Sequence, residues 1–183
     1  MKRNSNIEMI RRVAISLCVF VVSFSAFAQE RGDVAFGVNG LGGIYTDKIL
    51  SYGIGLKLLY NVADPVRLAA EMDFSAGTSY DDLIDSKLVS FGFQDYSLYA
   101  HYLIPISRKF LVYPLIGGGM LRKSTKTEIF DNSEKKIVYK MVGSFGAGFE
   151  YAITNNLSSS VELRFKHDGR NHYIYLASIA YKF

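Results

Sequence analysis

The chain has 183 residues, of which 21 are Lys or Arg, 17 are Asp or Glu and 49% are hydrophobic. The first 28 residues carry four of the basic residues, one acidic residue and the only cysteine, Cys18, so the rest of the chain has 17 basic and 16 acidic residues. A nearly neutral chain argues against nucleic-acid binding driven by net charge. The lack of a thiol after residue 28 excludes a disulfide framework and a cysteine nucleophile.

Residues 1–28 have the three parts of a secretory signal peptide. A basic start with Lys2 and Arg3 is followed by an apolar run from Val13 to Phe24 and by the small-residue motif Ala26-Phe27-Ala28. An N-terminal membrane anchor is the alternative, but the run is shorter than the ~20 apolar residues of a spanning helix. We therefore expect cleavage after Ala28 and one mature domain, residues 29–183.

The composition of the mature domain favours a sheet. The sequence holds 13 Tyr, 13 Phe and 16 Gly but 3 Pro, and no apolar run long enough for a transmembrane helix follows the leader. Enrichment in aromatic residues and glycine, together with alternating segments, is typical of closed barrels.

Eight segments alternate between apolar and polar residues and are predicted to be strands. They span residues 33–45, 52–61, 66–77, 91–104, 110–121, 139–151, 157–165 and 173–183. The fifth segment is ambiguous, because both of its faces are apolar and it contains Gly117-Gly118-Gly119.

The connections between these segments alternate in length. Residues 62–65, 105–109 and 152–156 form short connections, whereas residues 78–90 and 122–138 form long, polar ones. Short turns at one end and longer loops at the other are typical of outer-membrane barrels, so both termini are expected at the periplasmic end. The segment 122–138 is expected to be the longest external loop.

The apolar face of the strands is predicted to point outward. One face is rich in Tyr, Phe, Leu, Ile and Val, and the other carries charges of both signs in near balance. In the alternative, a soluble lipid-carrying barrel, the apolar face would point inward. Balanced charges fit better as paired groups inside a bore that eight strands leave just wide enough for side chains. The expected interior charge network consists of Lys57, Arg67, Glu71, Asp73, Asp95, His101, Lys140, Glu150, Glu162, Arg164 and Lys182.

The last strand ends in Tyr181-Lys182-Phe183, and an amphipathic strand that ends in an aromatic residue resembles the C-terminal strand of outer-membrane barrels. Residues 29–183 resemble the small outer-membrane β-barrel family of the eight-stranded OmpA/OmpX type, on segments such as Tyr113-Pro114-Leu115 and Glu162-Leu163-Arg164-Phe165. The resemblance implies an all-β fold, an eight-stranded antiparallel up-and-down transmembrane β-barrel in the bacterial outer membrane. It also implies contact with outer-membrane lipids and lipopolysaccharide, and assembly by the barrel-assembly machinery and periplasmic chaperones, with Tyr181 and Phe183 as the assembly signal.

The expected function is non-enzymatic. We expect a monomeric barrel, plugged by its own side chains, that contributes to envelope structure, surface interaction or adhesion. A small porin for ions or small solutes is one alternative. No cofactor, metal or nucleic-acid partner is expected, and His101 near Asp95 and Tyr99 is interpreted as part of the interior network rather than as a metal site.

A lipid A modifying hydrolase is the second alternative. The stretch from Glu162 to His167 is similar to the region that carries the catalytic His of lipid A 3-O-deacylases. Those enzymes have a Ser two residues after the His, where this chain has Gly169, which cannot act as a nucleophile. The hydrolase is therefore disfavoured.

Overall fold

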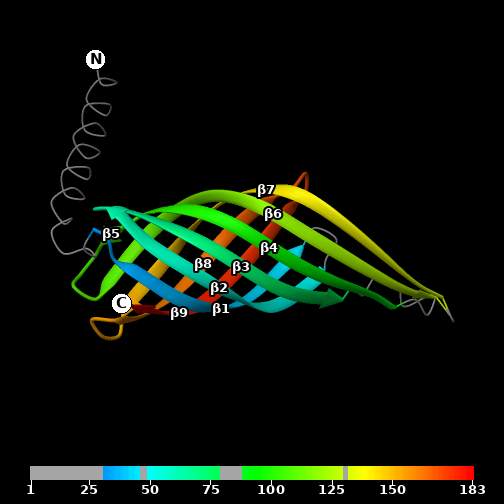
Figure 1. Cartoon of the computed structure of the whole chain (residues 1–183), viewed down its shortest axis with the longest axis horizontal. Coiled ribbons are helices and arrows are strands. Elements are labelled where there is room, and N and C mark those ends of the chain that lie inside the picture. The colour runs from blue at the N-terminus through cyan, green and yellow to red at the C-terminus, as the bar shows by residue number, and fades with distance from the viewer. Residues whose placement is uncertain (1–30, 46–48, 79–87, 130–131) are drawn as a thin grey trace, which may run out of the picture.

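The protein is a single sheet rolled into a closed barrel, shown from the side in Figure 1. The computed structural model describes residues 31–45, 49–78, 88–129 and 132–183, so the expected signal peptide lies outside the described residues. The strands in chain order are β1 (Val34–Tyr45), β2 (Ile49–Ala63), β3 (Val66–Thr78), β4 (Leu88–Tyr102), β5 (Ile104–Pro105), β6 (Phe110–Ile129), β7 (Asn132–Ala152), β8 (Leu157–His167) and β9 (Asn171–Lys182). No helix in these described ranges is long and apolar enough to cross a membrane.

Antiparallel pairing runs around the whole ring. The order is β4-β3-β2-β1-β9-β8-β7-β6, and β4 pairs with β6 to complete the circle. β5 is a two-residue bridge that pairs with the start of β6 and adds no strand to the ring. The predicted eight-stranded, up-and-down barrel is therefore confirmed.

The two ends of the barrel differ. The N-terminal end of β1 and the C-terminal end of β9 lie at one end, together with the short connections after β2, β4 and β7 (Figure 1). We call this the terminal end and the opposite one the distal end. By the pattern of outer-membrane barrels, we infer that the terminal end faces the periplasm and the distal end faces outward from the cell.

The outside of the barrel is apolar and the inside is charged. Ile54, Leu98 and Met141 point outward and are 72%, 68% and 79% exposed, whereas Arg67 and Arg164 are 1% and 0% exposed. This polarity is the reverse of that in a soluble protein, where large apolar side chains are buried and charges lie at the surface. The outward apolar face is confirmed, and the inward-facing alternative of a soluble lipid carrier is wrong.

Residues 122–138, expected to form a loop, are instead mostly strand. The pairing of β6 with β7 continues from Arg122 opposite Tyr139 to Ile129 opposite Asn132. Each face of this hairpin carries polar side chains, so the apolar alternation that marks a membrane strand is lost although the backbone stays extended.

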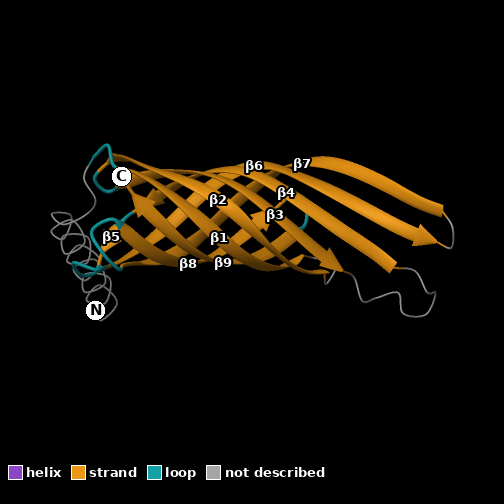
Figure 2. Ribbon diagram, turned by 60° about the horizontal axis from the view of Figure 1, so that its bottom comes forward, coloured by secondary structure: helices purple, strands orange, loops and turns teal. Residues whose placement is uncertain are grey.

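The extended hairpin makes one side of the barrel longer than the other. β8 pairs with β7 only as far as Gly143, whereas β4 pairs with β6 up to Leu88 opposite Glu128. As a result β4, β6 and β7 project past the other strands at the distal end (Figure 2). We call residues 88–94, 122–129 and 132–142 the projecting sheet.

Two glycines make room for aromatic rings inside the barrel. A Cβ atom on Gly117 would lie 2.5 Å from the Tyr99 ring and 2.1 Å from the Leu98 carbonyl oxygen, and one on Gly148 would lie 2.3 Å from the Tyr113 ring. Any side chain at these positions would overlap its neighbours. The glycine stretch that is ambiguous in the sequence is therefore part of β6, and Gly117 leaves the space inside the barrel that the Tyr99 ring occupies.

Candidate functional site

The bore is the candidate site suggested by the sequence. Nine of the eleven residues expected there are buried: Lys57, Arg67, Glu71, Asp73, Asp95, His101, Glu150, Glu162 and Arg164. The other two, Lys140 and Lys182, lie near the distal and terminal ends, and about a third of each side chain is exposed.

Arg164 spans the bore at its centre. Its Nη2 donates to Glu71 Oε1 at 2.8 Å, and its Nε donates to Glu162 Oε2 at 2.8 Å. β8 and β3, which carry Arg164 and Glu71, are four steps apart in either direction around the eight-stranded ring. They are therefore opposite one another, and the ion pair crosses the full width of the bore. The guanidinium carbon also lies 4.2 Å from the centre of the Tyr99 ring.

Lys57 completes the charge balance around Glu162. Its Nζ lies 3.2 Å from Glu162 Oε1 and donates to the hydroxyls of Ser160 and Ser178 at 3.2 and 2.6 Å. These partners come from β8 and β9, so Lys57 on β2 also reaches across strands that are not its neighbours. Three donated contacts compensate for burying the ammonium group.

A second cluster surrounds Arg67. Its Nη1 donates to Glu150 Oε2 at 2.7 Å, and its Nε lies 3.4 Å from His101 Nδ1. The guanidinium carbon lies 4.9 Å from the centre of the Tyr113 ring, which stacks on the His101 ring at a centroid distance of 4.7 Å. The Tyr113 hydroxyl donates to Glu162 Oε1 at 2.8 Å and so joins the two clusters.

Asp95 belongs to a third group, which includes a residue that the sequence interpretation missed. Lys166 is buried and its Nζ donates to Asp95 Oδ2 at 2.6 Å, while the Ser97 hydroxyl donates to Asp95 Oδ1. Asp95 is thus an ion-pair partner of Lys166, and the expected closeness of Asp95 to His101 is not reflected in a contact. Asp73 accepts a hydrogen bond from Asn39 Nδ2 at 3.3 Å.

The geometry around His101 does not resemble a metal site. Its Nδ1 faces the Arg67 guanidinium, which would repel a cation. Among the described residues, no group of three or more His, Cys, Asp or Glu side chains could hold a metal ion.

Apolar side chains fill the bore on either side of the charges. A cluster toward the distal end consists of Leu41, Phe93, Leu121, Val142, Ile174 and Leu176, which come from five strands around the ring. A second cluster, toward the terminal end, consists of Leu59, Ala69, Tyr99, Leu103, Tyr113, Leu115 and Ala180. The bore is therefore layered, with charges between apolar side chains.

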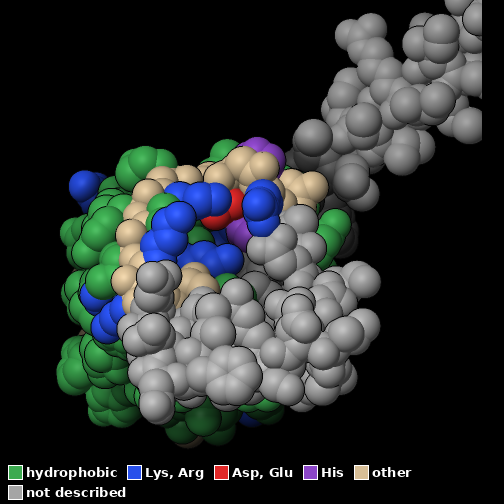
Figure 3. Space-filling view, turned by 90° about the vertical axis from the view of Figure 1, so that its right-hand side faces the viewer, with side chains coloured by type: hydrophobic (Ala, Val, Ile, Leu, Met, Phe, Trp, Pro, Cys, Tyr) green, Lys and Arg blue, Asp and Glu red, His purple; other side chains and the backbone are tan. Residues whose placement is uncertain are grey.

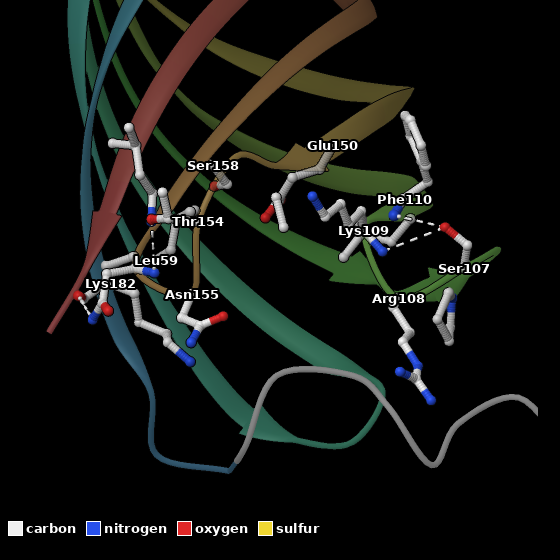
Figure 4. Close-up of a pocket in the computed structure, with 16 residues that line it drawn as sticks. Leu59, Ser107, Arg108, Lys109, Phe110, Glu150, Thr154, Asn155, Ser158 and Lys182 are labelled. Atoms are coloured by element: carbon white, nitrogen blue, oxygen red, sulfur yellow. Dashed lines mark hydrogen bonds between the residues drawn. The ribbon is translucent and has the colours of Figure 1, made fainter.

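At the terminal end, Lys182 lies 3.1 Å from Asp33. A cavity of about 390 Å³ opens beside it (Figure 4), with Arg108, Lys109 and Glu150 on its walls. Glu150 is also the partner of Arg67, so this cavity ends at the charged layer of the bore.

At the distal end, Asp168 joins a lysine and a histidine. Its carboxylate lies 3.0 Å from Lys140 Nζ and 3.0 Å from His172 Nε2. Burial acts to raise the pKa of Asp168, but the hydrogen bonds from Lys140 and His172 outweigh it and hold the pKa below its ordinary value.

His167, the residue of the hydrolase alternative, is exposed at the end of β8. Its Nδ1 lies 2.9 Å from the Asn171 amide oxygen, which cannot serve as a nucleophile. Gly169 follows in the turn with a φ of +92°, a left-handed conformation that favours glycine over serine.

Comparisons with known proteins agree with this geometry. Comparison with curated proteins finds no match. Among solved structures, the chain is similar to OprG from Pseudomonas aeruginosa (16% identity, TM-score 0.59, 85% of this chain and 98% of that one) and to Neisserial surface protein A (12%, 0.58, 82% and 96%). It is also similar to Ail, the attachment invasion locus protein of Yersinia pestis, in complex with the heparin analogue sucrose octasulfate (18%, 0.56, 84% and 100%). At these identities the likeness shows the fold.

The family is shown by a separate match. The model described as outer membrane protein beta-barrel domain covers residues 14–181, which is nearly the whole chain. An apolar belt around a closed barrel is what such a domain presents to lipid. The chain therefore belongs to the outer membrane protein β-barrel family and resides in the bacterial outer membrane.

Proposed function

We propose that this protein is a non-enzymatic, monomeric barrel that does not conduct ions and that acts at the cell surface through its distal end. The observation that carries the first part is the Arg164–Glu71 ion pair, which joins opposite walls of the bore. A conducting pore needs a continuous aqueous path, and here the middle of the path holds paired side chains.

The layered interior supports a closed bore. An ion that entered from the distal end would have to pass the apolar cluster around Phe93 and Leu121, and hydrophobic constrictions exclude water as well as ions. It would then meet four buried cations, each of which is paired with a carboxylate. A closed barrel is therefore favoured over a small porin.

Single-channel recording in a planar bilayer tests this proposal. We expect no stepwise conductance from the unaltered protein. The double variant R164S/E71S removes the crossing pair and keeps the local charge balance, so we expect it to show more openings than the unaltered protein. The matched control D33S/K182S removes an ion pair at the terminal end and should remain silent. Regular conductance steps from the unaltered protein would contradict the proposal.

The projecting sheet supports a role in surface interaction. It carries β4, β6 and β7 past the rest of the barrel on the side inferred to face outward, and it presents Lys126, Lys135 and Lys136 to solvent or to a partner. Ail, the attachment invasion locus protein of Yersinia pestis, has the same barrel fold. A surface role for this chain is consistent with that likeness.

We further propose that residues 1–28 are cleaved after Ala28 and that the barrel-assembly machinery, with periplasmic chaperones, reads Tyr181 and Phe183. The Phe183 ring is 77% exposed and packs edge-on against Tyr181 at 5.3 Å, so it is accessible to a partner. Replacing Phe183 with Ala should reduce the amount of heat-modifiable protein in the outer membrane without lowering the stability of the molecules that assemble. Normal assembly of this variant would argue against the signal.

A further inference from the structure

Every methionine of the expected mature domain lies in one row on the outer wall. Two of the five methionines belong to residues 1–28, and the other three are Met72, Met120 and Met141. Met72 of β3 pairs with Tyr96 of β4. Tyr96 also pairs with Met120 of β6, which in turn pairs with Met141 of β7. Paired residues of antiparallel strands point to the same face of the sheet, so the three thioethers follow one line around the barrel. We call them the methionine row.

The methionine row lies at the distal boundary of the apolar belt. The next outward row toward the distal end contains Gln94 and Arg122, and Arg122 Nη1 donates to the Gln94 amide oxygen at 2.7 Å. Figure 3 looks onto the distal end and shows hydrophobic side chains on the outer wall, with Lys and Arg side chains nearer the opening. Aromatic side chains mark the boundary between lipid and water in outer-membrane barrels, and Tyr96 and Tyr139 occupy these two rows. We therefore infer that the sulfur atoms lie close to water as well as to lipid.

The three methionines differ in exposure. Met141 is 79% exposed, whereas Met72 and Met120 are 38% and 40% exposed. Among the described residues, β8 pairs with β7 only up to Gly143, so β8 does not flank Met141. Any apolar side chain would suit lipid at these positions, but a thioether adds a sulfur atom that peroxides oxidise to a sulfoxide. Oxidation follows access to the sulfur, so Met141 should react first.

Arg122 provides a hydrogen-bond donor for an oxidised methionine. Its Nε is buried and has no hydrogen-bond acceptor among the described residues. Arg122 stands two residues from Met120 on the same face of β6. It pairs with Tyr139, so Met141 is its diagonal neighbour on β7. Diagonal neighbours are about 7–8 Å apart, which long side chains can bridge. A sulfoxide oxygen on either methionine can therefore accept a hydrogen bond from this Nε.

We propose that the methionine row is an oxidation site that consumes hydrogen peroxide at the outer boundary of the lipid while the barrel stays folded. The sulfur lone pair attacks one peroxide oxygen, an S–O bond forms and the O–O bond breaks. The sulfur loses two electrons and becomes a sulfoxide, and the second oxygen leaves with both peroxide protons as water. Arg122 then donates to the sulfoxide oxygen, which offsets the cost of a polar group beside lipid. This function is separate from the closed bore and from surface binding, because it uses only the outer wall.

The order of oxidation tests the site. The mature barrel in phospholipid vesicles is treated with hydrogen peroxide, and peptide mass spectrometry follows each sulfoxide over time. We expect all three methionines to react, and Met141 to react about twofold or more faster than Met72 and Met120, because its exposed fraction is about twice theirs. N-acetylmethionine amide in the same suspension is the fully accessible reference. Oxidation of this reference without oxidation of Met141, or equal rates at the three positions, would overturn the site.

A variant at Arg122 tests how the barrel tolerates oxidation. Urea unfolding in the same vesicles gives a midpoint for each protein before and after peroxide, so each variant is its own reference. We expect oxidation to lower the midpoint of R122L more than that of the unaltered protein, because leucine has no donor for the sulfoxide oxygen. The matched control R108L loses a guanidinium at the exposed terminal end and should respond to oxidation as the unaltered protein does.

The triple variant M72L/M120L/M141L shows whether the methionine row is the source of these changes. It keeps apolar side chains toward lipid but has no thioether, so we expect peroxide to leave its midpoint unchanged. Equal losses in R122L and the unaltered protein would overturn the role of Arg122. Unfolding of the oxidised unaltered protein, or a loss in the triple variant as large as that in R122L, would overturn the proposal.

Discussion

The middle of the bore and the distal end of the barrel both contain several charged side chains, but the burial of these charges differs. In the middle, the buried cations Lys57, Arg67, Arg164 and Lys166 face the buried carboxylates Glu71, Asp73, Asp95, Glu150 and Glu162. At the distal end, Lys140 pairs with Asp168, and 36% of the Lys140 side chain is exposed. Each cation of the first set is buried and paired with a carboxylate, whereas the distal pair lies beside solvent.

This difference predicts that the two regions contribute unequally to the stability of the barrel. A buried charge is tolerated only when its partner is fixed in place, so the bore groups act as permanent cross-links between walls. Charges beside open water carry a smaller desolvation cost, and their pairing contributes less to stability. We therefore assign the larger contribution to stability to the bore and the smaller one to the distal end, and the following variants separate the two.

The largest effect is expected from R164M. This change leaves Glu71 and Glu162 in the bore without their shared guanidinium, and breaking a buried pair in this way costs about 3–5 kcal/mol of unfolding free energy. Urea unfolding in lipid vesicles, followed by gel mobility of unboiled samples, measures it. The double variant R164M/E71M keeps Lys57 with Glu162 and should recover part of the loss. A loss under about 1 kcal/mol for R164M would be no larger than that of an exposed ion pair, and it would contradict the difference between the two regions.

A smaller effect is expected from G148A. The new methyl group would sit 2.3 Å from the Tyr113 ring and would displace the hydroxyl that joins the Arg67 and Glu162 clusters. Overpacking of this kind costs about 1–3 kcal/mol. G143A is the matched control, because a Cβ atom at that position meets no other atom within 4 Å. The same unfolding assay should show a lower stability for G148A than for G143A. Identical unfolding curves would show that the position of the Tyr113 ring does not affect stability.

The smallest effect is expected from D168N, and it depends on pH. The folded pKa of Asp168 is lowered, so its stabilising contribution is fully present above the ordinary carboxyl pKa of about 3.9 and is lost as the pH falls through the lowered value. The partner Lys140 is partly exposed, which limits the contribution to under about 1 kcal/mol. Melting temperatures of both proteins from pH 7 to pH 2 should differ at neutrality and converge in acid. A constant difference at all pH values would mean that the carboxylate charge has no role.

The sequence predicts which side chains point inward, because apolar and polar residues alternate along each strand wherever one face of the strand meets lipid. Arg67 and Arg164 were placed in the bore for this reason. Lys166 continues the same alternation after Arg164 but was missed, because the expected strand stopped at Phe165, two residues before β8 ends. Extending the alternation by one polar position would have found it.

Two other features could not be obtained from the pattern. The choice of Glu71 as the residue opposite Arg164 depends on how far each strand is shifted along its neighbour, a quantity that accumulates around the whole ring. Residues 122–138 are expected to form a loop because Lys123 to Glu128 and Ser133 to Lys136 have no apolar face. These strands are held by backbone pairing to β4 and to each other. Backbone pairing does not require an alternating hydrophobic pattern, so the sequence pattern does not reveal it.

The pairs that cross the bore also bear on how the barrel enters a bilayer. Arg164 and Glu71 are 93 residues apart, and Lys57 and Glu162 are 105 residues apart, so the early strands cannot satisfy their charges until β8 arrives. A partly built sheet would place Lys57, Arg67 and Glu71 unpaired at membrane depth, where lone charges are strongly disfavoured. Insertion should therefore be cooperative across the whole chain, because a barrel without its last strands would expose unpaired charges to the bilayer.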